Sequence, residues 1–356
     1  MNSPTANTTN YQTSNLQLQL GFINYIQRLL VEGDFSATYK YALLHALADC
    51  AVEYPLDDER ASLCIKFDSL VDKFIELYWH HATPFAGTTG TNDLLLQNAG
   101  KQSKVISELN YCQSKNIRTL NALKQSQYWH SIQKATLQTL KEGPLWRLQK
   151  LSKVDECFLY PHVKGKTFIT LNPGIANCFR RFYDLVVHLA RNAWLLKIQS
   201  IKQNQHIIGA QSQLYDFLFG CDRQSLAKAV PVLFEIQKGN CFYCNKPLGN
   251  SKQVDHFIPF ARYAHDLGHN FVLAHGKCNN AKRDLLAAPK FKDEWINQNL
   301  VIHEKEITKA LESYFYCDAA KSLAVSDWAY DTVASSKGHF WHGLMPATNS
   351  ARTAYR

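Results

Sequence analysis

One stretch, from Cys241 to Asp284, constrains the fold more than any other part of the chain. It contains two ligand pairs with two residues between their members, Cys241/Cys244 and His275/Cys278. Such pairs place soft or borderline ligands one turn apart, which suits a closed tetrahedral zinc site. We therefore predict a structural zinc ion held by these four side chains. His265 and His269 are nearby alternatives to His275 as the fourth ligand.

Between the two pairs the chain reads Val-Asp255-His256-Phe-Ile-Pro, then Asn270, and after Cys278 comes Asn279-Asn-Ala-Lys282-Arg283. This layout, over about 45 residues, resembles the HNH endonuclease family, the zinc-stapled branch of the ββα-metal nucleases, in a prokaryotic form. The resemblance implies a two-stranded ribbon, a loop and a helix.

The resemblance also implies roles for individual residues. It makes His256 the general base and Asp255 a ligand of a catalytic divalent cation. Asn270 would tie the loop to the strands, and Asn279 would complete the cation site. Two positions depart from the commonest pattern: His275 stands where Cys is usual, and Asn279 stands where His is usual. Both replacements keep the chemistry, because imidazole binds zinc and an amide oxygen binds magnesium.

The same residues make chemical sense without the family. Hydrolysis of a phosphodiester needs a base for the attacking water and a cation beside the phosphate. Histidine titrates near neutral pH, so His256 can serve as the base. The oxygens of Asp255 and Asn279 would leave most of the shell of Mg²⁺ or Mn²⁺ to water and phosphate. The alternative to a catalytic role is that His256 is an ordinary core histidine. The alternative to a zinc site is that Cys241, Cys244 and Cys278 are three buried thiols.

The charge distribution indicates a polyanionic partner. The chain carries a net charge of +9, and between Lys238 and Lys292 there are nine Lys and Arg residues and three Asp residues. We predict that Lys277, Lys282 and Arg283 contact DNA, with RNA as a possible alternative substrate. A merely solvated basic surface is the competing interpretation.

Other cysteines and the first residues bear on localisation. Seven cysteines stand singly in apolar stretches and are expected to be buried thiols of a reducing cytosol: Cys50, Cys64, Cys112, Cys157, Cys178, Cys221 and Cys317. Residues 1–15 are polar and have no signal-peptide pattern, and no apolar run reaches the roughly 18 residues of a membrane span. We expect a cytoplasmic protein with no membrane contact.

The fold class expected is α+β, mainly α, with a helical amino-terminal region followed by a ββα-metal nuclease module and a helical extension. The predicted divisions are a disordered tail (1–15), a helical domain (16–150), a β-hairpin plus a long helix that link or bind the target (151–235), the nuclease module (236–290), and a helical extension and tail (291–356). The hairpin is placed at residues 157–162 and 166–171, around Lys164-Gly165. The helix of Ser36–Tyr54, apolar almost all round, is expected to form the core.

The predicted function is that of a metal-dependent DNA endonuclease. The family resemblance suggests restriction or anti-phage defence, with a possible homodimer or a defence-system partner protein. A catalytically silent, zinc-containing nucleic-acid-binding protein is the alternative, because Asn279 replaces the usual His.

Overall fold

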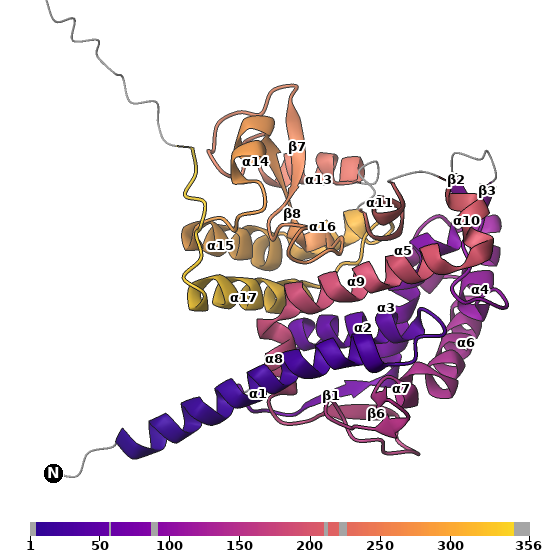
Figure 1. Cartoon of the computed structure of the whole chain (residues 1–356). Coiled ribbons are helices and arrows are strands. Elements are labelled where there is room, and N and C mark those ends of the chain that lie inside the picture. Colours follow the sequence, from indigo (N-terminus) through magenta and orange to yellow (C-terminus); the bar gives the residue numbers. More distant parts are fainter. Residues whose placement is uncertain (1–4, 57, 87–91, 210–212, 221–225, 345–356) are drawn as a thin grey trace, which may run out of the picture. The chain divides into compact units, whose positions relative to one another are not determined.

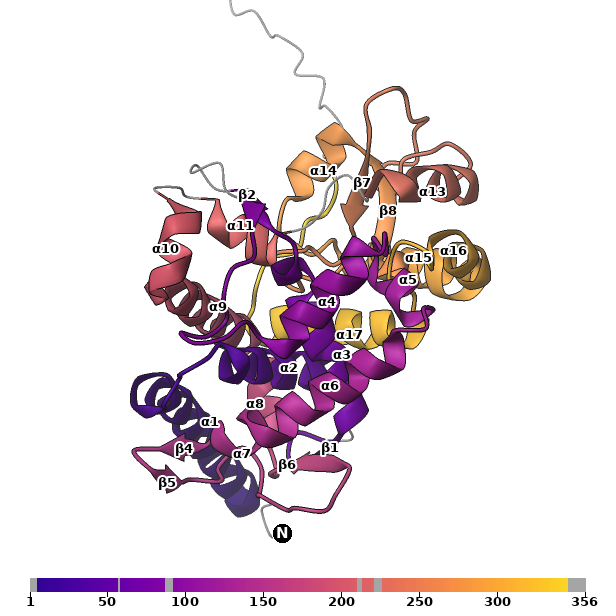
Figure 2. The ribbon, with the colours of Figure 1, turned by 90° about the vertical axis from the view of Figure 1, so that its right-hand side faces the viewer.

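The chain folds into two compact units, Met1–Gly220 and Cys221–Arg356. The structure is a computed structural model and describes residues 5–56, 58–86, 92–209, 213–220 and 226–344. Figures 1 and 2 show both units as ribbons coloured along the sequence. Helices dominate both, and each small sheet has two strands, which confirms the expected mainly helical α+β class.

Unit 1 is the helical part of the chain. Its elements are α1 (Thr5–Glu32), α2 (Tyr39–Glu53), β1 (Leu63–Lys66), α3 (Phe67–Tyr78), η1 (His80–Ala82), β2 (Phe85–Ala86), β3 (Asn92–Asp93), α4 (Lys104–Ser114), α5 (Leu120–Lys124), α6 (Trp129–Glu142), α7 (Pro144–Arg147), β4 (Lys150–Leu151), β5 (Val154–Asp155), β6 (Phe168–Leu171), α8 (Ile175–Arg181), α9 (Tyr183–Ser200), α10 (Lys202–Ile208) and α11 (Leu214–Phe219).

Helix α2 forms the centre of unit 1, as its all-round apolar sequence predicts. Every one of its residues from Lys40 to Glu53 is buried. The helix packs against α3, α7, α8 and α9 (Figure 2). A helix that is apolar on all faces is stable only when neighbours cover it on all sides, and these four helices provide that cover.

The predicted hairpin at residues 157–171 does not form. Strand β6 pairs instead with β1, antiparallel, with Leu63 opposite Leu171. The segment before it is held by Gln149, whose side-chain oxygen accepts hydrogen bonds from the amides of Leu159 and Tyr160. Pro161 in this segment has no N–H to give to a strand partner. The turn residues Lys164-Gly165 predicted that residues 166–171 would pair with residues 157–162. Their actual partner is β1, which lies about 100 residues earlier in the chain.

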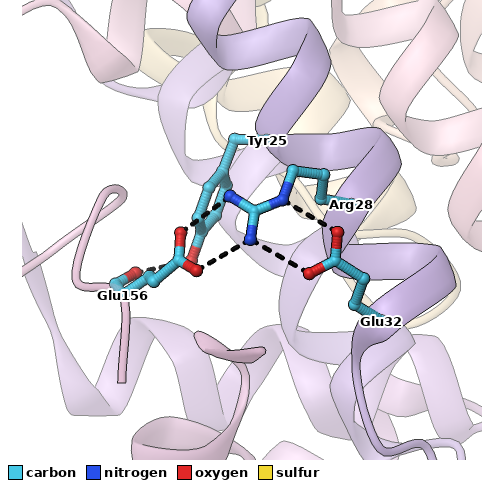
Figure 3. Close-up of polar contacts among 4 residues, drawn as sticks. All are labelled: Tyr25, Arg28, Glu32 and Glu156. Carbon is cyan, nitrogen blue, oxygen red and sulfur yellow. Dashed lines mark hydrogen bonds and ion pairs between the residues drawn. The ribbon is translucent and has the colours of Figure 1, made fainter. Parts of the chain in front are cut away.

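Helix α1 begins at Thr5, inside the segment of residues 1–15 for which a disordered tail is predicted; residues 1–4 lie outside the described part of the chain. Further along α1, Arg28 lies between two carboxylates, 2.9 Å from Glu32 Oε1 and 2.8 Å from Glu156 Oε1 (Figure 3). The Tyr25 hydroxyl donates a hydrogen bond to the Glu156 carbonyl at 2.7 Å. These contacts attach α1 to the segment after β5.

Residues 151–220, treated above as part of a linking region, belong to unit 1. Strand β6 pairs with β1, and α9 packs on α2. The single long helix expected here is two helices, α8 and α9, separated at Phe182, where φ is −112° and ψ is 24°. The Phe182 ring stacks on Phe22 of α1 at 6.2 Å. The residue at which the two helices separate, Phe182, is therefore also one that packs on α1.

Two of the cysteines expected to be buried are exposed, Cys64 and Cys157, and Cys221 lies outside the described residues. In the described part of the chain, no helix combines the length and the apolar character needed to cross a membrane.

Unit 2 contains the stretch from Cys241 to Asp284 with the four predicted zinc ligands. Its elements are η2 (Ala227–Ala229), α13 (Val230–Ile236), β7 (Lys252–His256), η3 (Gly268–Asn270), β8 (Phe271–His275), α14 (Gly276–Lys282), α15 (Pro289–Trp295), the π-helical η4 (Ile296–Ile302), α16 (Glu304–Leu311) and α17 (Ala319–Ser335).

The predicted ββα order is present as β7, β8 and α14. The two strands pair antiparallel from Lys252–His275 to His256–Phe271. On one face of the ribbon, Phe271 and Leu273 join a core with residues of α13 and α16. The extension after residue 290 packs onto this module, because the Trp295 ring stacks on Phe257 at 4.8 Å. The module and its extension therefore share one core.

Candidate metal centre and active site

The four predicted zinc ligands come together at the base of the ribbon. The ligand atoms of Cys241, Cys244, His275 and Cys278 all lie within 4.8 Å of one another. Cys241 and Cys244 lie in a tight turn closed by hydrogen bonds from the Cys241 amide to the Lys246 carbonyl and from the Asn245 amide to the Cys241 carbonyl. His275 ends β8, and Cys278 lies in α14. The group fits a structural zinc ion, because three thiols and one imidazole complete a tetrahedron.

His275 is oriented as a zinc ligand requires. Its Nε2 lies 3.0 Å from the Pro247 carbonyl, which can only accept, so this nitrogen carries the proton. Nδ1 is then unprotonated, and it lies 3.3 Å from Cys244 Sγ. A ligating histidine normally donates its other ring N–H in this way. The alternatives His265 and His269 are not members of this group of four.

The thiols influence one another strongly. Burial raises the pKa of Cys244, but hydrogen bonds from the Lys246 amide and from Cys241, His275 and Cys278 outweigh it, so the pKa is lowered overall. Burial and the neighbouring Cys241 and Cys244 raise the pKa of Cys278 to about 12. The neighbouring thiols contribute to both shifts, because a thiolate at one position disfavours a second thiolate beside it. A divalent cation removes that conflict, which supports the fit of zinc.

His256 lies at the carboxyl end of β7 and has a carboxylate partner. Its Nε2 is 2.7 Å from Asp266 Oδ1. The ring packs against Phe271, its cross-strand neighbour, at 5.1 Å and against Phe260 at 5.4 Å. The His256 side chain is 10% exposed, so it is held in one orientation yet still reaches solvent. A carboxylate on one ring nitrogen leaves the other, Nδ1, as the basic atom.

Asp255 projects to the opposite face of the strand, because adjacent residues of a β-strand alternate. There its Oδ2 accepts a short hydrogen bond from the Tyr243 hydroxyl and lies 3.1 Å from Lys282 Nζ. Lys282 Nζ also donates to the His256 carbonyl at 3.0 Å. Within the described residues, Asp255 Oδ1 makes no hydrogen bond. One carboxylate oxygen is therefore used inside the protein, and the other remains for a cation.

Asn279 lies on the same face of the ribbon as Asp255. Its side-chain nitrogen donates to Gln253 Oε1 at 3.0 Å, and Gln253 precedes Asp255 by two residues on β7. Helix α14 thus packs against β7 (Figure 1). The hydrogen bond places Asn279 beside Gln253, and the ion pair places Lys282 beside Asp255. The bond to Gln253 fixes the amide so that its oxygen points away from Gln253. Asp255 and Asn279 can both offer an oxygen to a hard cation such as Mg²⁺.

Asn270 lies inside the loop that follows β7. Its Oδ1 accepts from the Ile258 amide at 2.8 Å, and its Nδ2 donates to the Ile258 carbonyl at 2.9 Å. Its own carbonyl accepts from the Phe257 amide at 2.7 Å. With both ends of its side chain used in this way and only 2% of the residue exposed, Asn270 holds the loop next to His256 rather than facing solvent.

The three residues predicted to contact DNA differ in their exposure. Lys277 and Arg283 are exposed on α14 and at its end. Lys282 is fully buried, and burial lowers its pKa while Asp255 opposes that change. A surface phosphate contact by Lys282 does not fit this position. The helical period explains the difference, because the residue one turn after Cys278 and Asn279 faces the ribbon.

Sequence reasoning missed Asp266, Tyr243 and Gln253. The sequence held a signal for two of them. Tyr243 lies between the first two predicted zinc ligands, and Gln253 lies two residues before Asp255 and therefore on the same face of the strand. Asp266 carried no local signal, because it meets His256 only after the intervening loop folds back.

Two family models match the chain. The model described as domain of unknown function (DUF8808) matches residues 19–218, more than half of the 356 residues. The model described as HNH endonuclease matches residues 241–285, which confirms the resemblance found in the sequence. No protein with a curated description and no solved structure matches the chain.

Proposed function

The chain belongs to the family described as domain of unknown function DUF8808 and carries an HNH endonuclease domain, and we propose that it is a metal-dependent endonuclease that hydrolyses DNA phosphodiester bonds. The observation that carries the proposal is the pair of His256 and Asp266 at the end of β7, together with the oxygens that Asp255 and Asn279 offer on the opposite face of the same ribbon. The HNH domain itself acts on nucleic acids, and the exposed Lys277 and Arg283 on and beside α14 suit a phosphate backbone.

In this mechanism His256 removes the proton from the attacking water at Nδ1. Asp266 accepts the Nε2 proton in a hydrogen bond, fixes this tautomer and stabilises the imidazolium that forms. Asp255 Oδ1 and the Asn279 amide oxygen would hold Mg²⁺ or Mn²⁺. When bound, this ion neutralises charge that develops on the phosphate. Asn270 keeps the loop after His256 in place through Ile258.

The two metals would have separate tasks. The group of four zinc ligands, Cys241, Cys244, His275 and Cys278, offers no fifth position. Zinc there would hold the turn of residues 241–246, here called the knuckle, to the ribbon and would take no part in the reaction. The oxygens of Asp255 and Asn279 suit a harder, weakly held ion.

One observation favours a second candidate, a catalytically silent nucleic-acid-binding protein. The buried ammonium group of Lys282 lies 3.1 Å from Asp255 Oδ2. It neutralises the one carboxylate of the proposed cation site and would oppose a divalent ion there. A site with a weak affinity for magnesium would be inactive unless bound nucleic acid contributed phosphate oxygens to the ion.

Digestion of supercoiled plasmid, linear duplex, single-stranded DNA and RNA with Mg²⁺, Mn²⁺ or EDTA tests the proposal. We expect DNA cleavage with either metal, none with EDTA, and a loss of at least about 100-fold in His256→Ala. His303 pairs with Glu306 at 2.7 Å on the surface of the same unit, so His303→Ala is a matched control that should keep full activity. DNA binding without cleavage of any substrate would establish the silent alternative.

A role in restriction or anti-phage defence, with a homodimer or a partner protein, is a further prediction from the family resemblance. Phage plating on cells that carry the wild-type gene or the His256→Ala gene tests it.

A further inference from the structure

The first unit contains a cavity of about 330 Å³ that the nuclease chemistry does not use. It lies at the amino-terminal end of α2 and is bordered by the end of α6 and by α7, elements that can be followed in Figure 2. Charged side chains on its lining are Asp34, Lys40, Glu142 and Arg147. The volume is at the lower end of the range for small-molecule sites in proteins.

Lys40 is the unusual member of this lining. The residue is only 8% exposed. In the part of the chain that the structure describes, it makes no hydrogen bond or ion pair, and its ammonium group lies 5.2 Å from the centre of the Phe35 ring. The Lys40 nitrogen is not among the unpaired polar atoms that are completely buried, so the side-chain stem is covered while the ammonium group reaches the cavity. The positive charge of Lys40 is therefore available for an anion inside the cavity.

Other positive groups gather at the same place. Arg147 lines the cavity and, among the described residues, has no ion pair. Burial lowers the pKa of Lys40, Asp34 opposes this, and Arg147 and Lys150 lower it further. Helix α2 adds the positive end of its dipole, with no acidic residue in its first turn and no side-chain cap from Thr38.

The acids on the lining limit what can bind. Asp34 is exposed, and Glu142 accepts a hydrogen bond from Gln138 at 2.7 Å. They would repel a second anionic group, but they can accept hydrogen bonds from hydroxyl or amino groups. A ligand that suits both ends of the cavity has one phosphate group and an uncharged part with hydrogen-bond donors.

We propose that this cavity binds a small phosphate monoester, whose phosphate group is held by Lys40 and Arg147 at the amino-terminal end of α2. The site would give the family domain of residues 19–218 a ligand-binding role that is separate from the nuclease chemistry of unit 2.

Isothermal titration calorimetry on the full-length protein tests this with adenosine monophosphate, inorganic phosphate and adenosine at constant ionic strength. We expect adenosine monophosphate to bind more tightly than inorganic phosphate, and adenosine not to bind. Lys40→Met and Arg147→Gln should each weaken binding at least about tenfold, since each removes a charge-assisted hydrogen bond. Lys134→Gln, an exposed lysine of α6 outside the cavity, should change nothing.

Several results would overturn the proposal. It is overturned if neither adenosine monophosphate nor inorganic phosphate binds at millimolar concentration. It is also overturned if both variants bind as tightly as the wild type, or if adenosine binds as tightly as adenosine monophosphate. Equal affinity for the two phosphate compounds would make free phosphate the ligand and overturn the monoester. If Lys40→Met unfolds, the binding titration of Arg147→Gln alone tests the proposal, because Arg147 is exposed and its replacement removes no buried group.

Discussion

Lys282 Nζ lies 3.1 Å from Asp255 Oδ2, and Lys282 is fully buried between the ribbon and α14. The pair is completed by the Tyr243 hydroxyl on the same oxygen. Removing one partner of a buried ion pair leaves an uncompensated charge, which costs more than the pair itself contributes. This pair therefore links the stability of the ribbon to the state of the proposed cation site.

We predict that Lys282→Met destabilises unit 2 by roughly 3–5 kcal/mol, because Asp255 is left buried without its cation. Lys277→Met, an exposed position on the same helix, should cost less than about 0.5 kcal/mol. Urea unfolding of both variants measures the difference. An equal, small effect in both would show that Lys282 is not held as the structure has it.

Asp266→Asn should lower kcat by about 10²–10⁴ while KM and the melting temperature stay near wild-type values. The amide can donate to His256 Nε2, which would move the proton to Nδ1 and remove the basic lone pair. Cleavage kinetics and a melting curve on the same preparation test this. Glu306→Gln, which alters the surface pair with His303, is the control. Wild-type kcat in Asp266→Asn would exclude a role for Asp266 in orienting the base.

Salt dependence separates exposed from buried cations of α14. Arg283→Ala and Lys277→Ala should each flatten the slope of log K against log salt by about one unit if each residue contacts one phosphate. Lys282→Ala should leave the slope unchanged, since the ammonium group faces Asp255. Binding titrations at three or more salt concentrations provide the slopes. A flatter slope for Lys282→Ala alone would contradict the arrangement.

Metal analysis should find one zinc ion per chain that survives brief EDTA treatment, whereas cleavage stops with EDTA and returns with Mg²⁺ alone. Cys244→Ser should lose zinc and unfold the knuckle locally, because a closed site with three remaining ligands binds zinc poorly. The exposed Cys157 supplies the matched control, Cys157→Ser. Zinc-free wild-type protein, or activity restored by zinc alone, would refute the division between the two metals.

Unit 1 should lose stability in mild acid because of His81. Burial lowers the pKa of this fully buried histidine to about 3. The unfolded chain takes up the proton near pH 6.5, whereas the folded unit does not. Stability should therefore fall by about 1.4 kcal/mol for each pH unit from about 6.5 down toward 3. Urea unfolding at pH 7.5 and 5.0 measures this. His81→Phe should show a weaker pH dependence, and an equal dependence would count against His81 as the cause.

The sequence by itself determined the features that depend on residues close together in the chain. The spacing of Cys241, Cys244, His275 and Cys278 identified the group of four, and the apolar pattern of Ser36–Tyr54 identified the central helix. Ligand pairs two residues apart and helical periodicity are local geometry, so they can be recognised before the fold is known.

Only the tertiary structure decided the contacts between distant residues. It paired β6 with β1 in place of the local hairpin. It also brought Asp266 to His256, and it turned Lys282 inward to Asp255. Each depends on how a loop or a helix packs against a partner, and side-chain type alone does not fix that packing. From the sequence alone, a lysine near the end of a short helix is expected at the surface. Only the structure shows which face of the helix packs against the ribbon.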